Sequence, residues 1–283
     1  MSSSLTLRHE TGRHVDLVAG TQLLARYRYS PDTPVNEARR PFFHPVCSLA
    51  GDVLTNFRPN DHPWHHALSL TVTSIDGVNF WGGPSYRAED GYRPREDHGV
   101  QYHRAWETLS AERLVEIVEW REAASGRTLL EERRTLVPSV TAPAWSLRWT
   151  SELKNVCGWE LTLGNYHALG GLAGSHYTGL QFRGARDLLD EHGDATIGIT
   201  AEGDLRGEQA VHGTRAQWME WSCQHDESLR RTRIRFSSEM GPLPWFVRGK
   251  NPLAAFAFHD NRPQSLAAGD TLRLDHLLTF TCL

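Results

Sequence analysis

The chain has 283 residues, of which 39% are hydrophobic and 23% are charged, and its formal net charge is −4. These values are ordinary for a globular protein, and the acidic balance excludes the basic surface expected of a nucleic-acid binder. No apolar run approaches the roughly 18 residues of a membrane span, and the N-terminus has no apolar signal region. The four cysteines form no Cys-x-x-Cys pair. We therefore expect a cytoplasmic protein with reduced thiols and a single domain over residues 1–283.

Alternating apolar and polar residues predict β-strands in several parts of the chain. These parts are residues 67–75, 145–153, 232–238, 253–260 and 271–280. Turn-forming pairs such as Asp76-Gly77 lie between them. Many strands and few short helices predict an all-β fold, a large antiparallel β-sandwich.

Residues 110–138 have a composition that would also suit a helix. Gly126 interrupts the segment and its first half is rich in β-branched and aromatic residues, so we predict a long hairpin that turns near Ser125-Gly126. In a strand, Glu131 and Glu132 point to opposite faces. One Glu/Arg pair of this strand can then face inward, or both pairs can form surface ion pairs.

Residues 82–103 are polar and punctuated by glycine, and the pattern predicts no strand before Val100. Long polar loops in compact domains often act as lids or binding loops. A solvated excursion with no such role is the equal alternative.

The stretch RPNDHPWHHALSL, residues 58–70, contains three histidines. Pro63 restricts His62 to an extended conformation, and a strand that starts near Ala67 would carry His65 and His66 to opposite faces. The spacing of His62 and His65 suits a metal site, an acid/base site or a polar turn. The sequence leaves all three roles of these histidines open: metal ligands, acid/base groups, or residues that only stabilise the turn.

The neighbouring sequence adds further polar candidates. Two His-Pro pairs flank a turn predicted around residues 50–52, which could bring His44 close to the cluster. Arg39 and Arg58 lie nearby in the sequence, and Glu107 follows downstream as a carboxylate for acid/base chemistry. The remaining candidates for contact with a substrate are Trp64, Trp81, His103, Tyr166 and His167.

Several of these blocks together resemble a known family. The runs RRPFFHPV, DHPWHHALSL, DGVNFWGG, HGVQYH, LLEERRTL and NYHALGGLAG are similar to those of the bacterial DUF6807 family, often labelled PmoA-like. The family usually has HRGL where this chain has His65-His66-Ala67-Leu68. His66 stands where the arginine is common, so a role for that arginine does not transfer. The resemblance implies a cytosolic protein with a galactose-mutarotase-like supersandwich fold. It also implies a gene that lies near genes for sugar-oxidising dehydrogenases and other sugar-catabolic proteins. It does not imply a methane monooxygenase subunit, because the chain has no membrane span.

The leading hypothesis is a carbohydrate-processing enzyme that acts on a sugar or an oxidised (keto) glycoside, as a lyase, hydrolase or isomerase. His62 and His65 would be base and acid, or would bind one divalent metal together with His44. His44 or Glu107 would supply the second acid/base group or a further ligand. Arg39 or Arg58 would hold a substrate oxygen, and Trp64 or Trp81 would stack on the ring. The alternatives are a non-catalytic sugar-binding module or partner of a sugar dehydrogenase, and a sandwich whose histidines only satisfy turns.

Overall fold

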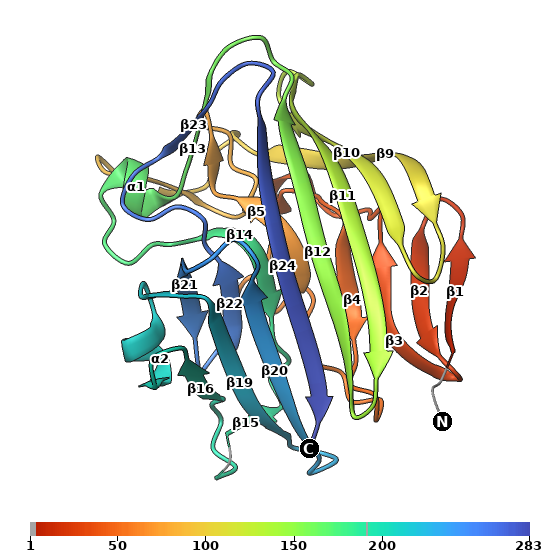
Figure 1. Cartoon of the computed structure of the whole chain (residues 1–283). Helices are drawn as coiled ribbons and strands as arrows, with labels where there is room; N and C mark the ends of the chain where they lie inside the picture. The colour runs from red at the N-terminus through yellow and green to blue at the C-terminus, as the bar shows by residue number, and fades with distance from the viewer. Residues whose placement is uncertain (1–3, 191) are drawn as a thin grey trace.

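Two large antiparallel sheets face each other in the computed structural model, which describes residues 4–190 and 192–283 (Figure 1). The first sheet has the order β1 (Leu5–Glu10), β2 (His14–Ala19), β3 (Gln22–Arg28), β4 (Phe42–Val46), β5 (Leu68–Val72), β14 (Thr178–Arg183), β22 (Leu253–Phe256), β21 (Leu243–Arg248) and β18 (Arg215–Ala216). The second has the order β17 (Leu205–Arg206), β16 (Gly198–Ala201), β19 (Trp218–His225), β20 (Arg231–Ser238), β24 (Thr271–Cys282), β12 (Ala144–Asn155), β11 (Thr128–Thr141), β10 (Leu114–Glu122) and β9 (Gly99–Leu109), and β15 (Leu188–Leu189) pairs with β19. The predicted all-β antiparallel sandwich is confirmed.

Small elements cover the rims of the sandwich. A short sheet joins β23 (Gln264–Leu266), β13 (Leu161–Gly164) and β6 (Ser74–Ile75), and β7 (Ser85–Arg87) forms a hairpin with β8 (Gly91–Arg93). The helical elements in the described ranges are α1 (Tyr166–Gly170), α2 (Gly207–Val211) and a 3-10 turn at Val35–Glu37. None of the described helices is long and apolar enough to cross a membrane.

The core lies between the two large sheets and follows from strand alternation. On β12, Trp145, Leu147 and Trp149 are buried, as the pattern predicts. On β24, Leu278 and Phe280 also point into the core, and Trp145 stacks on Phe280 with ring centroids 4.6 Å apart. Burial of these large side chains is the dominant stabilising contribution to such a sandwich.

A polar network lies inside this core, on the inner face of β11. Arg134 donates from Nε and Nη2 to Glu132, at 2.8 and 2.7 Å, and from Nη1 to the Tyr27 hydroxyl at 2.6 Å. Glu131 and Arg133, on the outer face, form exposed ion pairs instead. Of the two alternatives left open by the sequence, the structure therefore has the one in which a Glu/Arg pair faces inward.

Two local predictions need correction. Residues 82–103 contain the β7–β8 hairpin and β9 begins at Gly99, so the expectation of no strand before Val100 is wrong. The hairpin forms because Gly91, with φ of 71°, follows a three-residue turn and lets Tyr86 pair with Tyr92. The predicted strand 253–260 ends early, at Phe256. The hairpin of β10 and β11 turns around Ser125-Gly126 as predicted.

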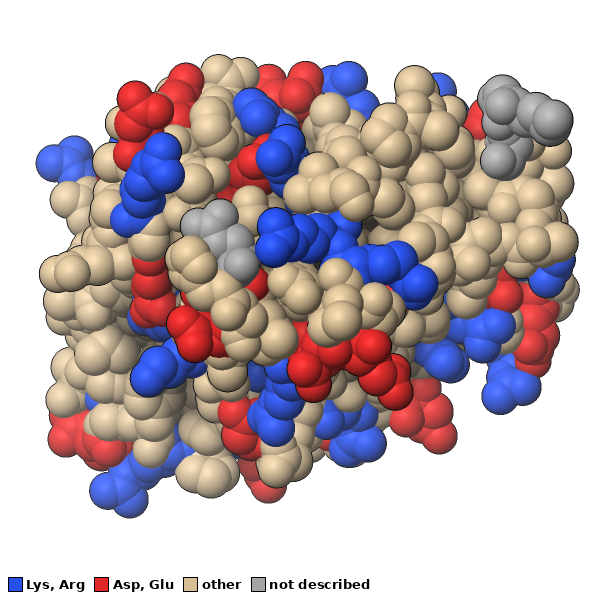
Figure 2. Space-filling model, turned by 90° about the horizontal axis from the view of Figure 1, so that it is seen from below, with Lys and Arg blue, Asp and Glu red and all other residues tan. Residues whose placement is uncertain are grey.

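Acidic and basic side chains are interspersed on the surface seen in Figure 2. That face has no continuous basic patch, in keeping with the net charge of −4.

Candidate functional site

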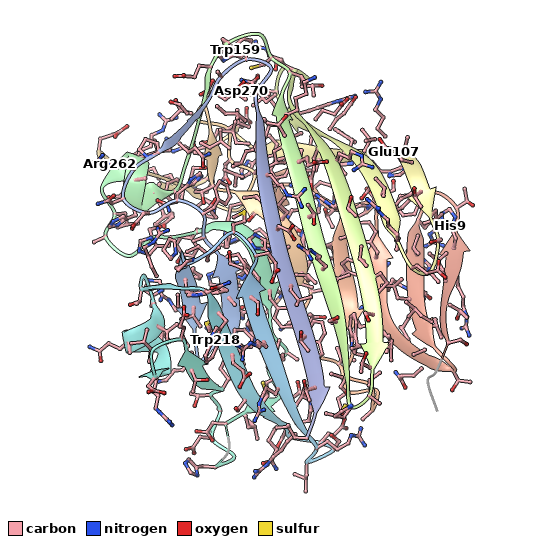
Figure 3. The ribbon with its side chains drawn as sticks, viewed as in Figure 1. His9, Glu107, Trp159, Trp218, Arg262 and Asp270 are labelled. Carbon is pink, nitrogen blue, oxygen red and sulfur yellow. The ribbon has the colours of Figure 1, made fainter. Side chains whose placement is uncertain are left out.

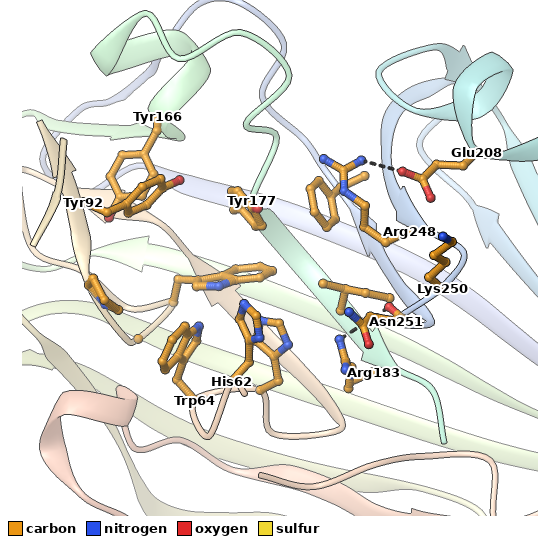
Figure 4. Close-up of a pocket in the computed structure, with 16 residues that line it drawn as sticks. His62, Trp64, Tyr92, Tyr166, Tyr177, Arg183, Glu208, Arg248, Lys250 and Asn251 are labelled. Carbon is orange, nitrogen blue, oxygen red and sulfur yellow. Dashed lines mark hydrogen bonds and ion pairs between the residues drawn. The ribbon is translucent and has the colours of Figure 1, made fainter. Parts of the chain in front are cut away.

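A pocket with a volume of about 500 Å³ lies in the described part of the chain (Figure 4). It opens beside the first sheet, between the 62–65 loop, the 81–84 loop, β14, α1, α2 and the turn that joins β21 to β22. Its lining residues are His62, Trp64, His65, Trp81, Gly82, Pro84, Tyr92, Tyr166, Tyr177, Arg183, Glu208, Phe246, Arg248, Lys250, Asn251 and Leu253. This size suits a small organic ligand such as a monosaccharide or its glycoside.

Aromatic rings form one continuous wall of the pocket. Tyr177 packs against Phe246 with ring centroids 4.4 Å apart and against Trp81 at 5.3 Å. Trp64 extends the wall past His62, and the ring centroids of these two residues lie 5.0 Å apart. Flat apolar faces of this kind are suited to packing against the C–H faces of a sugar ring.

Two consecutive glycines leave room for the Trp64 indole. A Cβ atom on Gly83 would lie 2.4 Å from Trp64 Cδ2, and one on Gly82 would lie 2.7 Å from Trp64 Cβ. Both glycines also have positive φ, 70° and 100°. The Gly-Gly pair is therefore what allows the indole to lie against the backbone at the pocket rim.

A fully buried arginine fixes the two loops that carry the tryptophans. Arg40 Nη1 donates to the Trp81 carbonyl at 3.2 Å, and Nη2 donates to the Trp64 carbonyl at 2.8 Å. The same guanidinium reaches the carbonyls of Glu37 and Ala38. Burial lowers the pKa of Arg40 to about 9, although the charge of Glu37 opposes this shift. Arg40 is thus a positioning residue for the aromatic wall.

His62 and His65 form the base of the pocket. The His65 amide donates to the His62 carbonyl at 3.0 Å and closes a turn that stacks the two rings, with centroids 4.9 Å apart. His65 is 3% exposed, and its Nδ1 has no hydrogen-bond partner. Burial first, and then the positive charges of Arg183 and His62, hold the pKa of His65 well below its usual value. His65 is therefore neutral at neutral pH, and its Nδ1 is free to hydrogen-bond a ligand.

His62 has a carboxylate beside it. His62 Nδ1 lies 3.2 Å from Asp61 Oδ2, and the other oxygen of Asp61 accepts from Arg186 Nη2 at 2.5 Å. Burial raises the pKa of Asp61, but His62, a backbone amide and Arg186 outweigh this and lower it overall.

The adjacent His66 faces away from the pocket. The two histidines diverge as predicted, although His66 forms an isolated bridge with Phe57 and β5 begins only at Leu68. Its Nε2 lies 3.0 Å from Glu37 Oε2, in a buried pair that Arg58 completes with 2.7 Å to Glu37 Oε1. Ala67 follows with φ of +46°, a backbone region that favours glycine.

Cations also line the pocket, and Arg248 lies over the Phe246 ring, 4.7 Å from its centroid. Arg183 comes from the end of β14, and Arg248 and Lys250 come from the end of β21 and the following turn (Figure 4). Glu208 of α2 lies among them and pairs with Arg248 Nη1 at 3.4 Å. The pocket therefore combines an apolar aromatic wall with predominantly positive side chains.

The structure brings together only some of the predicted site residues. His62, Trp64, His65, Trp81 and Tyr166 line the pocket. Their chemical roles remain predictions, because placement alone does not test them.

His44 lies elsewhere, which corrects the predicted grouping with His62 and His65. The turn at residues 48–52 forms as expected, yet His44 Nδ1 bonds to Thr55 Oγ1 at 3.0 Å and its ring packs near Phe57. Burial lowers the pKa of His44 to about 4. Within residues 4–190 and 192–283, no three His, Cys, Asp or Glu side chains are grouped to hold a metal ion. The proposed three-histidine ligand set is therefore not assembled.

Five further candidates also lie outside the pocket. Glu107 is exposed on β9 and accepts from Arg133 Nε at 2.8 Å (Figure 3). His103 is bonded to the core carboxylate Glu116 at 2.8 Å. Arg58 is held by Glu37, Arg39 lies over the Tyr102 ring, and His167 Nδ1 accepts from the Gly174 amide. Proximity in sequence was the reason for including Arg39 and Arg58. Glu107 and His103 lie on β9, which runs along one edge of the second sheet.

Sequence reasoning missed most of the charged residues of the pocket. Arg248, Lys250 and Glu208 carry no motif, and only the pairing of β21 with β22 and the position of α2 bring them to the pocket. Tyr177 and Arg183 had a weak signal, since they lie in a glycine-rich segment where backbone approaches closely. Gly179 shows this, because a Cβ atom there would lie 1.9 Å from the Phe256 carbonyl oxygen.

The fold and the pocket together define an antiparallel β-sandwich protein with an aromatic, histidine-bearing cavity. Residues 14–281 match the family described as a family of unknown function, DUF6807, and the chain belongs to that family. Among curated proteins, none matches the chain.

Solved structures show a distant likeness in architecture. A galactose mutarotase related enzyme from Lactobacillus acidophilus is 8% identical, with 98% of this chain and 97% of that chain covered and a TM-score of 0.36. A candidate aldose 1-epimerase from Escherichia coli K12 is 12% identical, with 99% of each chain covered and a TM-score of 0.37. The galactosidase domain of an α-galactosidase-sucrose kinase is 8% identical, with a TM-score of 0.36 over 99% of this chain, which spans 41% of that one. No conclusion about activity follows from such values.

Proposed function

We propose that the protein is a carbohydrate-processing enzyme that acts on a sugar or an oxidised glycoside bound in this pocket. The observation that carries the proposal is the stacked pair His62 and His65 at the base of a 500 Å³ pocket walled by Trp64, Trp81 and Tyr177. Aromatic faces suit the ring of the substrate, and adjacent histidines suit proton transfer at it.

The two histidines differ in a way that assigns their roles. His65 is buried and neutral, so it acts as the base that takes a proton from the substrate. His62 is more exposed and lies beside the Asp61 carboxylate, so it acts as the acid that returns a proton to a developing oxyanion or leaving group. Environments that separate two titratable groups in this way are typical of acid/base pairs.

Turnover of a panel of glycosides and 3-keto-glycosides, followed by proton NMR, tests the proposal. We expect conversion of at least one compound by the wild type and loss of conversion in His62→Ala plus His65→Ala. The control is His192→Ala, which changes a histidine of an exposed turn outside the pocket. Equal conversion by the wild type and the double variant would rule out the assignment.

A non-catalytic sugar-binding module is the second candidate. It is favoured by one observation: the single carboxylate of the described pocket lining, Glu208, is occupied by Arg248 and by the Gly249 amide at 2.8 Å. A binding module predicts saturable sugar binding, with no conversion of any compound in the panel over hours.

A further inference from the structure

One arginine of the pocket has an unused hydrogen-bonding edge. Arg183 is 2% exposed, and its Nε and Nη2 have no hydrogen-bond partner among the described residues. Arg183 Nη1 makes one long hydrogen bond, of 3.4 Å, to the Asn251 carbonyl. A buried guanidinium normally has its donors satisfied, because an unpaired buried donor is costly.

The free edge has a defined geometry, since Nε and Nη2 point the same way and form the side-on fork of a guanidinium. Other arginines of this chain use that fork to hold a carboxylate with two parallel bonds. They are Arg26 on Asp16 (2.7 and 2.8 Å), Arg134 on Glu132 (2.8 and 2.7 Å), Arg148 on Asp275 (2.8 and 3.0 Å) and Arg230 on Asp52 (2.8 and 2.5 Å). At Arg183 the corresponding carboxylate is missing from the described chain. The fork matches a planar carboxylate better than any other common group.

The charges around Arg183 also favour an anion. Three cations line the pocket, Arg183, Arg248 and Lys250, against the one carboxylate of Glu208. Asp61 is the nearby anion, but it is engaged by Arg186 at 2.5 Å and by His62. A negative group on a ligand would therefore enter a site with an uncompensated positive charge.

We propose that the ligand of this pocket is an acidic sugar, a uronic or aldonic acid or its glycoside, whose carboxylate binds the Nε/Nη2 edge of Arg183. This inference rests on the proposed carbohydrate function and specifies its substrate class. The carboxylate binds beside the long contact between Arg183 Nη1 and the Asn251 carbonyl. The positive charge of Lys250, on the same turn as Asn251, attracts the carboxylate to the pocket. The sugar ring lies against Trp81 and Tyr177, which places it over His65.

Isothermal titration with matched glycosides tests the proposal. The probes are methyl glucuronide and methyl galacturonide, the corresponding neutral methyl glycosides, and glucose 6-phosphate. We expect one uronide to bind at least about tenfold more tightly than its neutral counterpart and than the phosphate, because two charge-assisted bonds are added. Equal binding of acid and neutral sugar overturns the inference but leaves the carbohydrate function standing. Tighter binding of the phosphate overturns the carboxylate assignment, and binding of none of the probes contradicts both proposals.

Variants of Arg183 separate a ligand role from a structural one. Arg183→Lys keeps the charge and removes the fork, so we expect the preference for the uronide to fall at least about tenfold. The control Arg148→Lys alters the same fork outside the pocket and should leave binding unchanged. Arg183→Met should unfold at the same temperature as the ligand-free wild type or above it, because the unpaired donors are gone. A large loss of stability in Arg183→Met, with the uronide preference of Arg183→Lys intact, would show that Arg183 is structural.

Discussion

His65 and His66 are neighbours in the chain but face opposite environments. His65 lines the pocket with an unpartnered Nδ1, whereas His66 Nε2 lies 3.0 Å from the buried carboxylate of Glu37. His65 is thus available to bind a ligand, whereas His66 stabilises the loop that carries Trp64. The same substitution at the two positions should separate function from stability.

We expect His65→Leu to reduce turnover by about 100-fold or more, as the loss of a general base does, with little change in stability. His66→Leu should lower the free energy of unfolding by about 2 kcal/mol, because Glu37 loses a buried partner. Urea unfolding and the NMR turnover assay measure the two effects. A His65→Leu variant that keeps wild-type turnover would remove His65 from the mechanism.

The inner and outer faces of β11 provide a second matched pair. Glu132 is fully buried and bonded to Arg134, Trp120 and Ser151, whereas Glu131 is an exposed partner of Arg104. Glu132→Gln should cost about 3 kcal/mol in urea unfolding, since it removes the nearer of the two buried carboxylates that pair with Arg134. Glu131→Gln should change stability by less than about 1 kcal/mol. Equal costs would contradict the assignment of the network to the core.

The Gly-Gly pair predicts a change in ligand affinity without loss of the fold. Gly83→Ala should push the Trp64 indole out of place and weaken sugar binding by about tenfold, because the added Cβ atom overlaps the ring. Gly77→Ala is the matched control, since Gly77 has φ of +83° but no atom within 4 Å of an added Cβ. Titration calorimetry should show wild-type affinity for the control. If both variants bind equally well, Trp64 does not contribute to the pocket.

Buried histidines make stability depend on pH. Burial lowers the pKa of His276 to about 3, and its two ring nitrogens have no partner among the described residues. Below the usual histidine pKa of about 6.5 the unfolded chain takes up a proton that the native chain refuses, so stability falls as the pH drops from 6.5 toward the native value. His259 and His44 shift in the same direction for the same reason.

The variant His276→Leu should therefore reduce the slope of unfolding free energy against pH. The expected reduction is about 1 kcal/mol per pH unit between pH 6 and pH 4, measured by urea unfolding. An unchanged slope would show that His276 is protonated in the native protein or that another group dominates.

Strand alternation predicted much of the fold. The burial of Trp145, Leu147 and Trp149 depends only on local period, and the opposite directions of Glu131 and Glu132 follow from the same rule. The strand ends were less predictable. Whether β22 continues past Phe256 depends on its pairing with β14 and β21, which local pattern does not contain.

The pocket was only half predictable because its lining residues have different origins. His62, Trp64 and His65 come from one contiguous stretch, so their grouping could be read from the sequence. Arg183 and Arg248 reach the same cavity from strands that are far apart in the chain. Glu107 shows the converse error, because the strand that carries it lies at the other end of the second sheet.

The most direct test of the central claim is a crystal structure of the protein with the tightest-binding glycoside at saturating concentration. We predict difference density for the sugar ring against Trp81 and Tyr177, with His65 within hydrogen-bonding distance of the ring substituents. Density for the sugar at any other surface, with the pocket free of ligand, would contradict the assignment of this pocket as the carbohydrate site.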